Sequence, residues 1–512
     1  MHRWQKAWLG VLATAAILVA ACGGSSSGSS ASLPNGNVFR YAAPGEPDSL
    51  DPGGGISGFD QYFQNAIFDT LIVTDPKTMQ PNQPGLATSW EFVGSDKLTF
   101  RLHLRKGVKF QDGTPMDAAA VKTSLEHYKS LGQWRDLTQV QSINAVDSNT
   151  VDLKLSSQYS QLPGALAFRA GMIVSPTALQ KYGKDFGRHP VGAGPFAFKS
   201  WDPGSKISLT KFNGYWNKNA IHFNGIDYKI ITNAPSMVNA ILGKQIDFAQ
   251  LLNLPAPDMT ALKGNPDVES RINTTLSVGI VTTNDRIAPF NNEQVRQALN
   301  MSIDRQKLVE AMLGKGVGQG AASQYVPPNY WAYSKDLKAF PYDPGKAKQM
   351  LAQAGYPNGI SPQICTFSDD TTKAATIEKQ QMAPAGVNLQ IVQQPVNSCV
   401  GQLQSGGIPM VQIGWFFLAS AYQGYATMFG PGNPYGDFQG VNPLLAQVNS
   451  TYTQQEQAPL YHQLNQVLAQ RAPSIPTYYL VNPVAWSKRV NGLVTDINGV
   501  VRFNQANFTS GT

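Results

Sequence analysis

The 512-residue sequence has few charged residues and few cysteines. Its charged fraction is 14%, against roughly 25% in average soluble domains. Three cysteines exclude a disulfide-dense scaffold and a zinc ribbon built only from cysteines. No long run of basic residues accompanies the net charge of +7, so this charge does not indicate nucleic-acid binding. With 42% apolar and 10% aromatic residues, the chain can bury a large core, which excludes wholesale disorder.

The first 22 residues are organised like an export signal. A basic start with Arg3 and Lys6 precedes an apolar run over 7–20, and small residues lead up to Cys22. This run is shorter than the roughly 20 residues of a membrane-spanning helix. We therefore predict a signal peptide over 1–21. A cysteine directly after small residues resembles the lipobox of bacterial lipoproteins. This resemblance implies a lipidated Cys22, and the lipidated cysteine and a flexible Gly/Ser tether would span 22–32. The alternative is an ordinary signal peptide with a chance cysteine.

Export also changes the expectation for the remaining cysteines, Cys365 and Cys399, because disulfides persist outside the cell. A structural bridge between them is favoured, and two free thiols are the alternative. No metal or cofactor is expected, since the six histidines show no close ligand spacing and the P-loop and H-E-x-x-H motifs are absent. The sequence nominates no catalytic residue, although a carboxylate pair distant in sequence stays open.

Helix-like and strand-like patterns alternate along the chain, which predicts a mixed α/β fold. Apolar and polar residues alternate in two segments, as in half-buried strands. Apolar residues elsewhere recur at helical spacing, and Asp117 is a plausible helix cap. The predicted strands are 98–104 and 150–155, and the predicted helices are 117–131, 292–313, 343–355 and 454–470.

A series of short motifs extends from residue 38 to about residue 485. The most specific runs from Leu102 to Pro115 and reads LHLRKGVKFQDGTP. The others are Gly45–Pro52, Ile67–Leu71, Val191–Phe196, Asn213–Trp216, Val295–Asn300 with Ile303–Arg305, Tyr342–Ala347 and Ala472–Pro476. In kind and order they resemble the family 5 solute-binding proteins of ABC importers, the oligopeptide- and dipeptide-binding class.

The resemblance implies a two-lobe fold like that of the type II periplasmic binding proteins, with an extra subdomain. A two-strand hinge would let the lobes close around solute. The expected hinge crossings lie near Ser277 and Pro483. The expected parts are lobe 1 over 33–65, 190–270 and 485–512, a subdomain inserted in lobe 1 over 66–189, and lobe 2 over 271–484.

The segment 410–422 is the most unusual local sequence because it is almost entirely apolar and aromatic. Its simplest interpretation is a buried strand. The resemblance instead places Gly414 and Trp415 at the start of a cleft segment, whose main chain pairs with an extended ligand. Peptide binders of the family carry an Asp four residues after this glycine to bind the ligand ammonium. Here that position is Leu418, which puts binding of free peptide N-termini in doubt.

Two chain segments are predicted to line the cleft, one around Trp415 and one around Asp60. The aromatic residues of the segment around Trp415, together with Tyr425, suit apolar, cationic or sugar-like groups of a solute. Asp60 of the second is a candidate replacement for the missing acid. The predicted ligand-binding residues are Gly414, Trp415, Phe416, Phe417, Leu418 and Tyr422, and opposite them Gly58, Phe59 and Asp60.

The resemblance thus implies a receptor and not an enzyme. It would be a monomer, lipid-anchored to the outer face of the cell membrane, periplasmic or cell-surface. It would deliver a peptide-like or other medium-sized organic solute to the transmembrane subunits of an ABC permease, with no nucleic-acid partner. The alternatives are a secreted lipoprotein hydrolase and a solute-binding or adhesive lipoprotein without a transport role.

Overall fold

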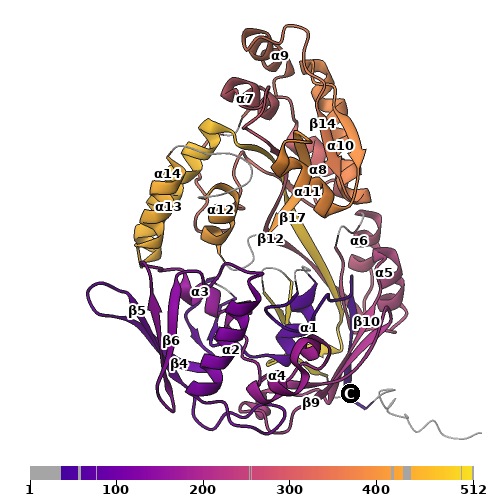
Figure 1. Ribbon diagram of the computed structural model, residues 1–512. Coiled ribbons are helices and arrows are strands. Elements are labelled where there is room, and N and C mark those ends of the chain that lie inside the picture. The colour runs from indigo at the N-terminus through magenta and orange to yellow at the C-terminus, as the bar shows by residue number, and fades with distance from the viewer. Residues whose placement is uncertain are drawn as a thin grey trace, which may run out of the picture.

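The computed structural model describes residues 36–55, 59–76, 78–252, 254, 256–338, 340–416, 420–430, 440–496 and 499–509, with backbone alone at 256, 415 and 416. The predicted signal peptide, Cys22 and the tether lie outside these residues. Figure 1 shows a broad lower lobe and a narrower upper lobe. The protein is a mixed α/β structure with two lobes (Figure 1), as the motifs predict.

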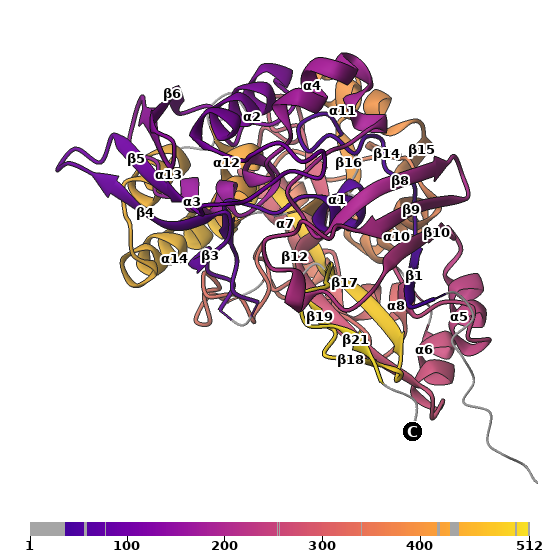
Figure 2. The same ribbon diagram turned by 90° about the horizontal axis from the view of Figure 1, so that it is seen from below.

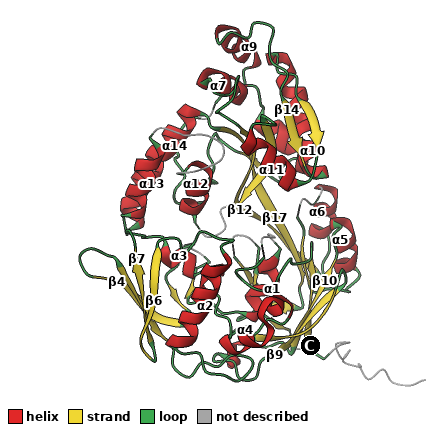
Figure 3. Cartoon of the chain, viewed as in Figure 1, coloured by secondary structure: helices red, strands yellow, loops and turns green. Residues whose placement is uncertain are grey.

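An eleven-stranded sheet in the described part of the chain extends through both lobes, in the order β15-β14-β16-β12-β17-β11-β1-β10-β9-β8, with β13 beside β17. Figure 3 shows β12 and β17 as long strands that run from the lower into the upper lobe. The lower-lobe strands are β1 (Val38–Ala43), β8 (Phe196–Asp202), β9 (Lys206–Lys211), β10 (Gly225–Ile230) and β11 (Phe248–Gln250). The shared and upper strands are β12 (Val268–Thr283), β13 (Gln319–Gly320), β14 (Gln363–Thr366), β15 (Gln390–Gln393), β16 (Met410–Phe416) and β17 (Ser474–Ser487).

The lower lobe also carries helices and short C-terminal strands. Figure 2, seen from below, shows the C-terminal strands gathered beside β17. The helices are α1 (Asp60–Ile67), α4 (Pro176–Tyr182), α5 (Ala234–Leu242) and α6 (Ala256–Lys263), with 3-10 turns at Gly183–Arg188 and Lys218–Ala220. The short strands are β18 (Val490–Asn491), β19 (Val494–Thr495), β20 (Val501–Arg502) and β21 (Asn507–Phe508).

A second sheet, with the order β4-β5-β7-β6, forms a subdomain of the lower lobe with its own apolar core. Its strands are β4 (Ala87–Val93), β5 (Thr99–Leu104), β6 (Val140–Asp147) and β7 (Thr150–Leu155), and β2 (Ile72–Val73) pairs with β3 (Gln83–Pro84) nearby. Its helices are α2 (Ala118–Leu131) and α3 (Leu162–Leu166), followed by a 3-10 turn at Arg169–Gly171.

Helices surround the strands of the upper lobe (Figure 1). They are α7 (Glu293–Met301), α8 (Arg305–Leu313), α9 (Pro344–Gln353), α10 (Asp369–Met382), α11 (Val396–Ser405), α12 (Ala421–Phe429), α13 (Val441–Asn449) and α14 (Gln454–Arg471), with a 3-10 turn at Ala383–Ala385. The residue boundaries predicted for lobes and subdomain stay predictions.

Most predicted elements are present, but the single helix predicted over 292–313 is wrong. This segment forms α7 and α8, and the chain turns between them at Ser302–Asp304. Asp304 caps α8, since its carboxylate accepts a hydrogen bond from the Lys307 amide at 3.0 Å. The apolar stripe continues through the break because both helices pack on one core. Asp117 caps α2 in the predicted manner, accepting from the Ala120 amide at 2.9 Å.

The ladder between β12 and β17 is interrupted where the strands pass between the lobes. The register runs from Val268 opposite Ser487, shifts between Thr274 and Val278 and again between Gly279 and Ile280, and ends with Thr282 opposite Ser474. Within the gap, the Thr275 hydroxyl donates to the Leu480 carbonyl at 3.0 Å. A break of this kind bends a strand pair locally, since it removes regular ladder hydrogen bonds.

Of the two arrangements left open for the cysteines, the structure has the disulfide between Cys365 and Cys399. It joins β14 to α11 across 34 residues of sequence. Both cysteines are fully buried, in a small apolar cluster with Leu403, Ile408 and Val411. The bridge therefore fastens a peripheral helix to the sheet of the upper lobe.

We expect the double variant Cys365→Ala/Cys399→Ala to lower the free energy of unfolding by about 3–4 kcal/mol, because the unfolded chain regains the entropy of a loop of this length. Urea unfolding of the oxidised wild type and the variant measures the difference. A reductant should destabilise the wild type similarly and leave the variant unchanged. Equal midpoints for wild type and variant would contradict a stabilising role.

Glu378 on α10 is a fully buried carboxyl group in the upper lobe. Burial raises its pKa from 4.5 to about 8. The Gln412 amide, turned so that its nitrogen faces the carboxyl group, donates to its two oxygens at 3.1 and 3.2 Å. Desolvation thus favours the neutral acid at this position.

The raised pKa of Glu378 predicts a pH-dependent loss of stability. Between about pH 4.5 and 8 the folded state holds a proton that the unfolded state releases, so the free energy of unfolding falls as pH rises through this window. Glu378→Gln should remove that loss of stability. The difference between its free energy of unfolding and that of wild type should therefore increase, in favour of the variant, up to about pH 8. Urea unfolding at pH 5, 7 and 9 tests this, with exposed Glu269→Gln as control. Identical pH profiles for wild type and Glu378→Gln would refute the prediction.

Candidate functional site

The subdomain of the lower lobe meets α12, α13 and α14 of the upper lobe, away from the hinge strands (Figure 1). The Ser160 amide donates to the Asn449 carbonyl at 2.9 Å, and its hydroxyl donates to the Val448 carbonyl at 3.0 Å. The rings of Phe92 and Tyr452 meet at 4.7 Å between centroids. Hydrogen bonds and ring contacts therefore connect the lobes at this edge as well as through the shared sheet.

Helix α12 makes a further contact between the lobes, directly after the predicted cleft segment. The Gln423 amide donates to one oxygen of Asp136 at 2.6 Å, and the Tyr128 hydroxyl donates to the other at 2.6 Å. Burial raises the pKa of Asp136, and these hydrogen bonds oppose that shift. The ring of Tyr422 lies 6.4 Å from that of Tyr159 and packs against apolar clusters of both lobes. Tyr422 thus lies between the lobes.

Asp60, at the start of α1, forms a buried ion pair with Arg169. Their side chains are fully buried, with 3.3 Å between Arg169 Nη1 and Asp60 Oδ2. The Asp48 amide donates to the other Asp60 oxygen at 2.8 Å. Burial raises the pKa of Asp60, against the opposing effect of Arg169. In this conformation the carboxylate is engaged inside the lower lobe, so its role toward a ligand stays a prediction.

The structure places the other predicted ligand residues in two regions. In β16 the backbone of Gly414, Trp415 and Phe416 pairs with Gly279, Val278 and Ser277 of β12. The ring of Phe59 fills the space beside Gly45, where a Cβ atom would collide with it. Tyr425 is fully buried and donates to Asn465 at 2.6 Å. Gly58, Phe417 and Leu418 lie outside the described residues.

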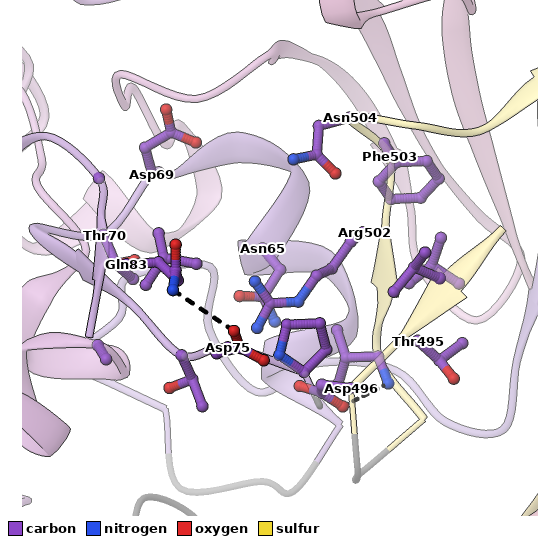
Figure 4. Close-up of a pocket in the computed structure, with 18 of the residues that line it drawn as sticks. Asn65, Asp69, Thr70, Asp75, Gln83, Thr495, Asp496, Arg502, Phe503 and Asn504 are labelled. Atoms are coloured by element: carbon purple, nitrogen blue, oxygen red, sulfur yellow. Dashed lines mark hydrogen bonds between the residues drawn. The ribbon is translucent and has the colours of Figure 1, made fainter. Parts of the chain in front are cut away.

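A cavity of about 790 Å³ lies beside the hinge strand β12 (Figure 4). Arg271 and Leu276 of β12 and Tyr330 of the upper lobe form one side of it. The remaining walls come from the end of α1, the β2–β3 region, the loop after α3 and the C-terminal hairpin of β19 and β20. Of the predicted ligand residues that the structure describes, none is among those that line it. The cavity is large enough for a small organic solute.

One half-buried carboxylate on the wall of this cavity is held by the protein itself. Asp69 accepts hydrogen bonds from the Tyr215 hydroxyl at 2.9 Å and from the Trp216 indole at 2.7 Å. Burial raises its pKa to about 6, while both donors lower it. The Arg105 guanidinium stacks on the Trp216 ring at 4.0 Å. These contacts fix the wall, so we assign Asp69 a structural role.

The charged and polar residues that line this cavity are not predicted by the sequence. Asp496 and Arg502 lie near the C-terminus, whereas Asn65 and Asp75 belong to the first hundred residues. No local motif connects segments so far apart, and only the folded chain brings them together. Among the described residues no cluster of three or more His, Cys, Asp or Glu side chains could hold a metal ion. Nor does any described helix have the length and apolar character to cross a membrane.

Three comparisons relate this chain to known proteins. Residues 82–436 match the family described as bacterial extracellular solute-binding proteins, family 5 Middle. The glutathione-binding protein GsiB of Escherichia coli K12 is 29% identical over 472 residues, covering 87% of this chain and 89% of its own. GsiB of Shigella flexneri has the same identity and coverage.

Solved structures share the fold. The periplasmic binding protein DppA of Helicobacter pylori, in complex with the peptide STSA, superposes with a TM-score of 0.80 at 24% identity, covering 92% of this chain and 98% of DppA. AgaA of A. tumefaciens R10, in complex with agropinic acid, gives 0.79 at 24% identity, covering 93% and 99%. Such proteins are substrate-binding receptors of ABC transporters and not enzymes, which decides against the hydrolase alternative. Since the family match covers more than half of the 512 residues, this chain belongs to the bacterial extracellular solute-binding proteins of family 5.

Proposed function

We propose that this protein is the membrane-anchored, extracytoplasmic receptor of an ABC importer. It captures a peptide-like or other medium-sized organic solute between its lobes and delivers it to the transmembrane subunits of the permease. It acts as a monomer, and lipid on Cys22 holds it at the outer face of the membrane.

The observation that carries this proposal is the connection between the lobes. β12 and β17 belong to both lobes, and their ladder is interrupted where they pass between them. At the opposite edge, Ser160 donates a hydrogen bond to Val448 and Gln423 donates one to Asp136. Both hydrogen bonds join the two lobes, so opening would break them and closing would restore them. An interrupted strand pair on one side and contacts that can break and re-form on the other are what hinge closure around a solute requires.

The relatives support a polar solute of peptide size. GsiB is named for glutathione, a tripeptide, and the DppA complex contains a tetrapeptide. Main-chain groups at the end of β16 suit an extended ligand, because strand-like pairing gives affinity with little dependence on side chains. In peptide binders of the family, an Asp binds the free α-ammonium group of the ligand, and this chain has Leu418 at that position. The substitution favours solutes that have no free α-ammonium group to bind there.

Native mass spectrometry of the gently purified protein tests the proposed function directly. We expect a retained small molecule, unchanged on prolonged incubation. Melting curves with di-, tri- and tetrapeptides and glutathione provide the second measurement, since a solute at 100 times its Kd stabilises the folded state by about 2.7 kcal/mol. Failure to retain a solute, together with no shift from the panel, would count against a peptide-like solute. Turnover of the retained molecule would count against a receptor.

We expect Trp415→Ala and Tyr422→Ala to weaken solute binding at least tenfold, because both aromatic side chains are predicted to contact the solute. Tyr342→Ala is the matched control, since Tyr342 is an upper-lobe tyrosine that is 42% exposed. Calorimetric titration with the identified solute measures the three affinities, and solute-free melting temperatures report folding. Unchanged affinity in both variants would refute the prediction that these aromatic residues bind the solute.

We expect Cys22→Ser to release the protein from the membrane fraction, because the variant has no residue to carry the lipid. Fractionation of cells that express wild type or variant measures the change, and a conservative change in the tether, Ser26→Ala, is the control. A variant that sediments with membranes as fully as wild type would contradict lipid anchoring at this residue.

A further inference from the structure

The cavity beside β12 has charged groups of both signs on its walls. Most of these groups already have partners within the protein. Asp75 accepts from the Gln83 amide at 3.4 Å, Asp496 accepts from the Val500 amide at 2.9 Å, and the Arg271 guanidinium donates to the Thr495 hydroxyl. With Asp69 held by Tyr215 and Trp216, one charged group remains to be explained.

That group is the guanidinium of Arg502 on β20. No hydrogen bond or ion pair with another described residue engages it, although it lines the cavity. Figure 4 shows its side chain extending from β20 toward Asn65 of α1. A half-buried guanidinium with five N–H donors and no acceptor in the described part of the chain is suited to an acceptor from outside the chain.

The fold holds Arg502 in place through its two neighbours. Val501 and Phe503 are buried in the core of the lower lobe, and the Phe503 ring meets the Phe39 ring at 5.4 Å. Because successive side chains of an extended strand point to opposite faces, Arg502 is directed away from that core. Its backbone is therefore fixed before any solute arrives, which lowers the entropy cost of binding.

We propose that Arg502 binds a carboxylate of the transported solute in this cavity. The inference rests on the proposed function, that a peptide-like solute binds between the lobes. A guanidinium matches the planar, two-oxygen geometry of a carboxylate and can donate two parallel hydrogen bonds to it. The solute class is thus narrowed to molecules with at least one free carboxylate.

The mixed charge of the cavity suggests a zwitterion over a simple anion. Asp75 and Asp496 line the same cavity, where their carboxylates add negative charge to its wall. A cationic group of the solute near these residues would balance the carboxylate on Arg502. Amino-acid derivatives and short peptides carry both charges.

A comparison of acid and amide ligands tests the proposal. Trialanine and its C-terminal amide differ in the group assigned to Arg502, and calorimetric titration against the full chain gives both affinities. For wild type we expect the acid to bind about 10- to 100-fold more tightly than the amide. In Arg502→Gln this preference should disappear through weaker binding of the acid, and Arg502→Lys should retain part of it.

The control variant is Lys199→Gln, which removes a positive charge from an exposed site on β8 of the same lobe. It should bind both ligands as wild type does, and solute-free melting temperatures establish that each variant is folded. An acid preference that survives in folded Arg502→Gln would overturn the assignment to Arg502 and leave the proposed function intact. If neither trialanine nor any other peptide of the panel binds wild type, both the peptide-like solute and this assignment fail.

Discussion

The β12–β17 strand pair is the constraint on which the arrangement of this protein depends. Each strand contributes hydrogen bonds to both lobes, so neither lobe has a complete sheet without the other. A covalent linker would set only a maximum distance between the lobes, whereas a shared ladder also fixes their orientation and the path along which they move. Two irregularities in register, between Thr274 and Val278 and between Gly279 and Ile280, interrupt the ladder along a short stretch of β12, where the pair can bend.

The low charged fraction of the sequence acquires a physical meaning in this fold. Several of the few charges are buried, and most buried charges have partners: Asp60 pairs with Arg169, and Asp247 with Arg40 and Arg489. Such pairs contribute little net stability, but loss of one partner leaves an uncompensated charge in the interior. They therefore restrict which sequences maintain the fold, while the apolar cores supply most of the stability.

The sequence predicted features that depend on local chemistry and missed those created by distant contacts. The Asp117 cap and its helix follow from neighbouring residues, and the ordered motifs predicted the family correctly. The break between α7 and α8 was hidden, because Asp304 caps α8 without interrupting the apolar stripe. The Asp136–Gln423 contact and the position of Arg502 depend on segments hundreds of residues apart. No spacing rule within one sequence predicts such proximity.

The contacts of Ser160 with α13 have a kinetic consequence. Their donor and acceptor atoms all belong to the protein, and separation of the lobes breaks them. A solute that enters or leaves the space between the lobes must therefore wait for that separation. The association rate is then limited by how often the lobes separate, and the residence time lengthens in proportion. Substitutions at this edge would alter both rates together and change the equilibrium affinity much less.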